Sequence, residues 1–171
     1  ATILSLNGPV SDPVVFRWDG RWWAVAGDER DLYAFHSPTL RADDWESHAG
    51  NPVVRDRPRA ARPGGRPIVR EDRIVLFLQQ CVSGYGEQVR AFEITDLSPE
   101  RYADAELDSS PTVRPDDSSV GWNSGKMHHV DPWFDGETWR CAVDGNIDLG
   151  QSVFGHNWSI GMYESAASVP Q

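Results

Sequence analysis

The chain repeats one pattern three times: an x-Pro step, a short apolar run, a charged turn and a second apolar run. The copies span residues 12–26, 66–78 and 131–143. Their apolar runs are rich in aromatic and β-branched residues, which suit a pleated strand. Two of the turns are Asp-Gly, a pair that tolerates the positive φ angles of a tight turn. Each copy therefore predicts a β-hairpin.

The spacing of the copies indicates a radial array. Pro13, Pro67 and Pro132 lie 54 and then 65 residues apart, which fits a propeller blade of about four short strands. The sequence therefore predicts one all-β domain over 1–171, a β-propeller of about three four-stranded blades. The expected blades are about 8–55, 60–115 and 122–171, with innermost strands at 14–18, 66–70 and 128–134.

Alternation of apolar and polar residues predicts the outer strands, at 32–37, 45–48 with 53–54, 88–94 and 158–164. Three segments are predicted as loops: 55–65, 109–125, and 97–102, the last as a short loop or a single helical turn. No long amphipathic helix is predicted. A closed propeller needs at least four blades, so three blades leave two apolar sheet faces bare. We expect missing blades of a longer protein, or another chain, to cover them.

The excess of acidic residues limits the classes of partner that the chain is expected to bind. The 26 acidic residues, 17 of them Asp, outnumber the 16 basic ones, and the net charge is −10. This charge argues against nucleic acid or an anionic membrane as the main partner. Abundant Asp with a single lysine resembles the proteomes of salt-loving archaea or GC-rich bacteria. No apolar run is long enough to span a membrane, and no signal peptide opens the chain.

Cysteine usage does not decide the compartment. Cys81 and Cys141 fall in the predicted second strands of adjacent hairpins, where two buried thiols are the simpler interpretation and a disulfide the alternative. We expect a soluble chain, and we favour the cytoplasm. No nucleotide-binding or phosphate-binding fingerprint is present, so no cofactor is expected.

Three charged residues occupy equivalent positions. Asp12, Arg66 and Asp131 each precede the proline of a predicted innermost strand, where strands converge on the central funnel. Two carboxylates and a guanidinium could grip sugar hydroxyls, and Asp12 and Asp131 could supply acid and base chemistry. The structural alternative is that each Asp caps a strand entry and that Arg66 bridges blades.

His129 and Asp131 are two residues apart on a predicted strand, so they point to one face and His128 to the other. Such a pair could relay protons, bind hydroxyls or ligate a metal. A zinc site needs a third protein ligand at suitable spacing, and none is visible, so no metal is predicted. A satisfied structural histidine is the alternative for either residue.

The 83–87 turn, Ser-Gly-Tyr-Gly-Glu, combines glycines that permit close approach with an aromatic ring and a carboxylate. Tyr85 could stack on a sugar ring, and Glu87 could act as a catalytic acid. An ordinary hairpin turn with one aromatic lid is the alternative. Most Trp residues are expected in blade cores, but Trp122 and Trp158, in or beside loops, are candidates for carbohydrate stacking.

Four segments carry a family resemblance, at 61–66, 80–86, 127–131 and 143–145. They resemble the propeller domain of the glucosamine inositolphosphorylceramide transferase family, which is similar to the five-bladed folds of glycoside hydrolase families 32, 43 and 68. The resemblance covers about residues 8–146 and implies the last three of five blades. It also implies that Gln80, His128 and Asp144 bind substrate. Catalytic residues on the first two blades would be absent here.

Two function classes follow. The favoured one is a carbohydrate-recognising domain of a carbohydrate-active protein, associated with a glycosyltransferase or similar to a glycoside hydrolase. We expect no catalysis by this chain alone; if it is active, it is a glycoside hydrolase or a glycosyltransferase-type enzyme. The alternative is a non-catalytic structural or protein-interaction propeller. A complete pair of catalytic carboxylates would discriminate between them, and no Glu occupies a matching position at the start of an innermost strand.

Overall fold

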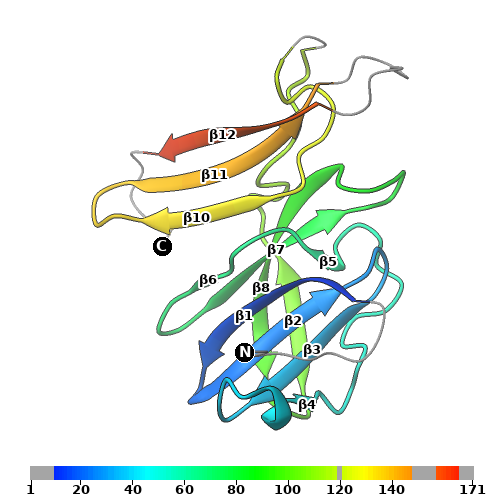
Figure 1. The fold of residues 1–171 in the computed structure, drawn as a ribbon, viewed down its shortest axis with the longest axis vertical. Helices are drawn as coiled ribbons and strands as arrows, with labels where there is room; N and C mark the ends of the chain where they lie inside the picture. Colours follow the sequence, from blue (N-terminus) through cyan, green and yellow to red (C-terminus); the bar gives the residue numbers. More distant parts are fainter. Residues whose placement is uncertain (1–9, 119–120, 148–156, 166–171) are drawn as a thin grey trace.

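The computed structural model describes residues 10–118, 121–147 and 157–165, which form three antiparallel sheets (Figure 1). The first sheet has the order β1-β2-β3-β4 and the third the order β10-β11-β12. In the second sheet the order is β5-β7-β8-β9, and β6 also pairs with β7. The strands of the first sheet are β1 Ser11–Trp18, β2 Arg21–Gly27, β3 Leu32–Ser37 and β4 Glu46–Ser47, with a 3-10 helix at Ala42–Asp44. Those of the second are β5 Arg62–Pro63, β6 Ile68–Val69, β7 Ile74–Gln80, β8 Gln88–Leu97 and β9 Tyr102–Glu106. Those of the third are β10 Val130–Phe134, β11 Trp139–Asn146 and β12 Trp158–Ser165.

Each predicted hairpin lies in its own sheet, as the repeat predicts. β1 pairs with β2, β6 with β7 and β10 with β11. The first turn has the expected backbone, because Asp19 and Gly20 have φ angles of 46° and 74°, and two positive φ angles match the twist of the flanking strands. The all-β class and the separate sheets are therefore confirmed.

The number and bounds of strands differ from the prediction of four per blade. The second sheet has five strands, because its inner edge is split into β5 and β6, and the described part of the third sheet has three. The inner strands expected at 66–70 and 128–134 are shorter, at 68–69 and 130–134. Gly65 separates β5 from β6 by bridging to Val130 of the third sheet instead.

The 97–102 segment contains the predicted short loop, at 98–101, rather than a helical turn: β8 runs to Leu97 and β9 begins at Tyr102. β9 was not predicted from the sequence, because its inward-facing positions include Asp104 and Glu106 and so do not form an apolar alternation. Their charges are met by the 55–65 segment, where Arg57 pairs with Asp104 and Arg59 with Glu106, both at 2.7 Å.

The second sheet is enclosed on both faces. Alternate residues of β7, starting with Ile74, pack on the first sheet against Trp23 and Val25. The residues between them, Val75 and Phe77, pack on the third sheet together with other buried residues such as Val130 and Val143. Because both faces are covered, β7 is apolar from Ile74 to Leu78 rather than alternating. The two cores thus define two seams between sheets.

Candidate functional site

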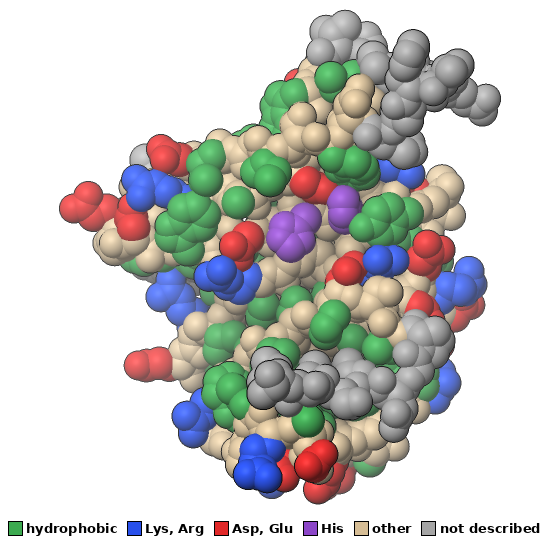
Figure 2. Space-filling view, in the orientation of Figure 1, with side chains coloured by type: hydrophobic (Ala, Val, Ile, Leu, Met, Phe, Trp, Pro, Cys, Tyr) green, Lys and Arg blue, Asp and Glu red, His purple; other side chains and the backbone are tan. Residues whose placement is uncertain are grey.

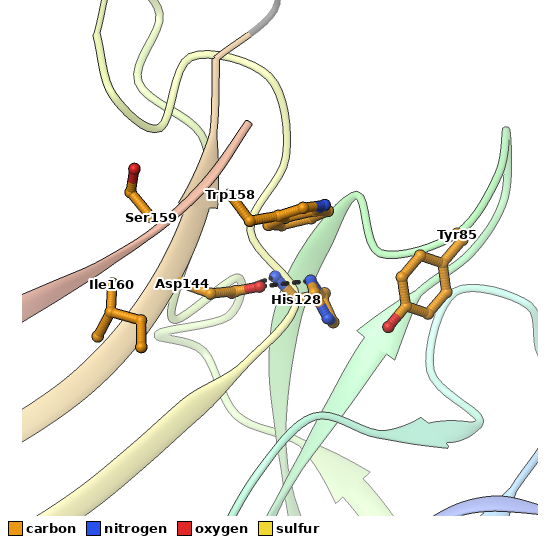
Figure 3. A pocket seen from close by; sticks show the side chains of 6 residues that line it. All are labelled: Tyr85, His128, Asp144, Trp158, Ser159 and Ile160. Atoms are coloured by element: carbon orange, nitrogen blue, oxygen red, sulfur yellow. Dashed lines mark hydrogen bonds and ion pairs between the residues drawn. The ribbon is translucent and has the colours of Figure 1, made fainter. Parts of the chain in front are cut away.

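A pocket of about 490 Å³ lies at the seam between the second and third sheets (Figure 3). Its lining comes from four separate parts of the chain: the turn between β7 and β8, the residues just before β10, strand β11 and strand β12. The lining residues are Tyr85, His128, Asp144, Trp158, Ser159 and Ile160. Two aromatic rings, an imidazole and a carboxylate therefore face one space, although they are up to 73 positions apart in the sequence.

Asp144 of β11 fixes the histidine segment that precedes β10. Its Oδ1 accepts hydrogen bonds from the backbone N–H groups of His128 and His129, at 2.9 and 2.8 Å. Its Oδ2 lies 2.5 Å from His128 Nδ1. Burial alone would raise the pKa of Asp144, but these donors outweigh it, so that the pKa lies below its usual value. The pocket thus contains an ionised carboxylate at neutral pH.

Aromatic rings flank His128. The Tyr85 ring centroid lies 4.8 Å from that of His128, and the Trp158 ring lies 4.5 Å away in an edge-on arrangement. The guanidinium of Arg62 sits over the Tyr85 ring, 4.7 Å from its centroid. Flat aromatic faces beside polar groups suit a ligand that is apolar on one side and hydroxylated on the other.

The Tyr85 turn is held in place by its neighbours. Lys126 Nζ donates to the Tyr85 carbonyl at 2.8 Å. Gly86 has a positive φ of 68°, and a Cβ there would lie 2.8 Å from His128 Cβ. This close approach requires glycine. Glu87 closes the turn by accepting from Gln80 Nε2 at 2.7 Å and from the Ser83 N–H.

The charged residues that precede the prolines form ion pairs across the seams. Arg66 Nε lies 2.7 Å from Asp131 Oδ1, joining the second and third sheets. Asp12 Oδ2 accepts from Arg62 Nε at 2.6 Å, joining the first and second sheets. Asp12 therefore pairs with Arg62, and Arg66 pairs with Asp131. The bridging role of Arg66 corresponds to the structural alternative that the sequence left open.

Two other predicted residues, Gln80 and Trp122, do not line the pocket. Gln80 accepts from Arg90 Nε and Gln88 Nε2 within its sheet. Trp122 is not in the pocket lining; it packs so closely on Gly145 and Gly161 that a Cβ there would lie within 2.7 Å of its ring. Histidine side chains lie on one face, bordered by acidic, basic and hydrophobic side chains (Figure 2).

Arg62, Ser159 and Ile160 were not predicted. Ile160 is 85% exposed and lies on β12 opposite Asp144. The alternation of β12 could have placed Ile160 on the same face as Trp158, but no local signal pointed to Arg62, whose role depends on Tyr85.

Both cysteines are free thiols, and burial raises the pKa of each.

Among the described residues, no group of three or more His, Cys, Asp or Glu side chains is placed to hold a metal ion. Likewise, in the part of the chain that the structure describes, no helix has the length and apolar character needed to cross a membrane.

The fold is shared with carbohydrate-active enzymes. The chain aligns with the GH32 β-fructofuranosidase BmSUC1 of Bombyx mori at a TM-score of 0.61 and 16% identity, covering 92% of this chain and 32% of that one. It aligns with a thermostable family-43 glycoside hydrolase at 0.53 and 14% identity, covering 91% and 47%. The three sheets are thus an all-β arrangement that resembles the five-bladed propellers of these families.

Sequence comparison identifies the family. Residues 2–146 match the family described as glucosamine inositolphosphorylceramide transferase 1, N-terminal, and the chain belongs to this family. It is 26% identical over 153 residues to glucosamine inositolphosphorylceramide transferase 1 of Oryza sativa subsp. japonica, covering 82% of this chain. Over 134 residues it is 26% identical to that of Arabidopsis thaliana, covering 74%. The chain spans about a fifth of the length of these relatives (20% and 17%).

Proposed function

We propose that this chain is a carbohydrate-recognising propeller domain of a glycosyltransferase-associated protein, and that the pocket between Tyr85, His128, Asp144 and Trp158 binds a sugar. The observation that carries the proposal is the pairing of two aromatic faces with an ionised carboxylate in one pocket. Sugar rings present an apolar C–H face that packs on aromatic rings, and their hydroxyls donate to carboxylates. The family relationship supports the carbohydrate context.

Catalysis by this chain alone is not part of the proposal. Glycoside cleavage commonly uses two carboxylates flanking the sugar. Asp12 and Asp131 are engaged by arginines, Glu87 by its own turn and Asp144 by His128. We therefore expect no hydrolysis of chromogenic aryl glycosides, and hydrolysis that disappears in Asp12→Asn or Asp131→Asn would make the enzyme interpretation correct.

The test measures the binding of sugars to the chain by calorimetry and by ligand-observed NMR. The names of the relatives suggest glucosamine and inositol phosphate as probes, beside glucose, galactose and mannose. Tyr85→Ala and Trp158→Ala should each weaken binding by about two- to tenfold, because each removes a stacking face that contributes on the order of 0.5–1.5 kcal/mol.

Phe134→Ala is the matched control. Phe134 is an exposed aromatic residue of β10 and does not line the pocket, so its loss should leave sugar binding unchanged. A folded chain that binds none of the probes would instead favour the structural or protein-interaction module.

A further inference from the structure

The pocket adjoins a second polar cluster through Tyr85. Tyr85 contacts His128 on the pocket lining and also carries the Arg62 guanidinium over its ring. Arg62 is in turn bound to Asp12 at 2.6 Å. Asp12, Arg62, Tyr85 and His128 therefore form a continuous series of contacts that leads from the third sheet to the first.

The Asp12–Arg62 pair keeps unused hydrogen-bonding groups. Both hydrogen bonds to Asp12, from Arg62 and from Gln79 Nε2 at 3.0 Å, use Oδ2. Oδ1 belongs to a side chain that is 44% exposed, and it has no hydrogen-bond partner among the residues that the structure describes. Within those residues, Arg62 likewise uses only Nε as a hydrogen-bond donor.

The pair is also held rigidly. Gln79 is buried and anchors itself by donating to the Pro63 carbonyl at 2.7 Å as well as to Asp12. Asp12 has a φ of 50°, at a register shift where β1 departs from regular pairing with β2. A carboxylate acceptor and planar guanidinium donors fixed side by side match adjacent sugar hydroxyls, which both donate and accept.

We propose that Asp12 and Arg62 form a second sugar subsite beside the pocket, with Tyr85 as the wall shared by both. The proposal rests on the proposed function. It implies that the ligand is an oligosaccharide of at least two units rather than a monosaccharide. Because the carboxylate and the guanidinium balance each other, the second unit is an uncharged sugar.

Calorimetric titration with monosaccharides and with disaccharides built from the same units tests the proposal. The wild-type chain should bind the preferred disaccharide at least about tenfold more tightly than its monosaccharide. Asp12→Asn should reduce this preference by about tenfold, since it removes a charge-assisted acceptor. The substitution keeps the backbone, because Asn tolerates positive φ.

Asp19→Asn is the matched control, because Asp19 also has a positive φ, of 46°, and lies at the other end of β1. Its preference for the disaccharide should equal that of the wild type. Arg62→Lys is a second variant if Asp12→Asn does not fold; it keeps the charge, loses the planar fork and should reduce the same preference.

Three outcomes overturn the second subsite while leaving the pocket intact. The first is a disaccharide that binds no more tightly than its monosaccharide, and the second is an Asp12→Asn variant that loses the same affinity for both ligands. The third is an Asp19→Asn variant whose preference for the disaccharide falls as much as that of Asp12→Asn. If neither monosaccharides nor disaccharides bind the folded wild type, the proposed function itself fails.

Discussion

Asp144 and His36 are both enclosed by the fold, yet one keeps its charge and the other is held neutral. Burial raises the pKa of Asp144, but donors from His128 and His129 more than compensate and lower it. For His36, burial lowers the pKa, and the nearby Glu46 carboxylate only partly opposes this. Hydrogen-bond donors stabilise the charged form of Asp144, whereas for His36 the nearby carboxylates do not offset burial and the nearby Arg21.

The lowered pKa of His36 predicts a loss of stability in mild acid. The unfolded chain binds a proton at an ordinary pKa of about 6.5, whereas the folded chain resists protonation. Stability from this group is therefore complete above about pH 6.5 and declines as the pH falls toward the lower folded pKa. Urea unfolding at pH 7.5 and 5.5 should show a larger decline for the wild type than for His36→Gln. The exposed His129→Gln serves as the control and should follow the wild type.

Gly65 is the backbone position that joins the second and third sheets. Its φ is 142°, and a Cβ there would lie 1.8 Å from the Val130 carbonyl oxygen. Gly65→Ala should destabilise the chain by about 2–4 kcal/mol through overpacking and strain. Gly20→Ala has open space around it and should cost only about 1–2 kcal/mol, for its positive φ. Chemical denaturation of both variants checks this, and equal effects would contradict a tight seam at Gly65.

Among the elements, β9 shows how ion pairs can secure a strand that lacks an apolar face. Arg57 forms two hydrogen bonds with the Asp104 carboxylate, at 2.7 and 2.8 Å, and Tyr102 donates to the same carboxylate at 3.0 Å. The Asp104 side chain is only 6% exposed. The long 55–65 segment is thereby fastened to the outer edge of the second sheet.

Burial predicts very different contributions from two Arg–Asp pairs. Asp104→Asn should destabilise the chain by about 2–4 kcal/mol, because it leaves the Arg57 guanidinium without its bidentate partner in a mostly buried position. Asp131→Asn should cost less than about 1 kcal/mol, since Arg66 is largely exposed and the pair is screened by solvent. Urea titration of the two variants provides the comparison. A loss for Asp131→Asn as large as that for Asp104→Asn would overturn this ranking.

At the scale of the whole molecule, the third sheet has one covered and one uncovered face. Val130 and Val143 pack into the core shared with the second sheet. On β12, the alternate residues Ile160 and Met162 are 85% and 53% exposed. Exposed apolar side chains of this kind are what a bare sheet face would present, and the relatives are about five times longer than the part that this chain matches.

The uncovered face predicts that the isolated chain self-associates. Met162→Lys should shift sedimentation toward the monomer at concentrations where the wild type associates, because a charge on this face opposes apolar contact. Val82→Lys replaces an exposed apolar side chain that lies outside β12, in the turn between β7 and β8, and should leave the association unchanged. A wild type that stays monomeric at every concentration, or an equal effect of Val82→Lys, would contradict the prediction.

The hairpins, their turns and the separation into three sheets are determined by the sequence itself, because apolar periodicity and Asp-Gly turns act within a few residues. The split inner strand, β9 and the pocket are decided only by tertiary structure. Gly65 leaves its own sheet to pair with Val130, and β9 depends on arginines more than 40 positions away. The pocket forms only because the second sheet packs on the third and brings together Tyr85, His128, Asp144 and Trp158. This packing depends on side-chain contacts between the sheets, which no local sequence pattern encodes.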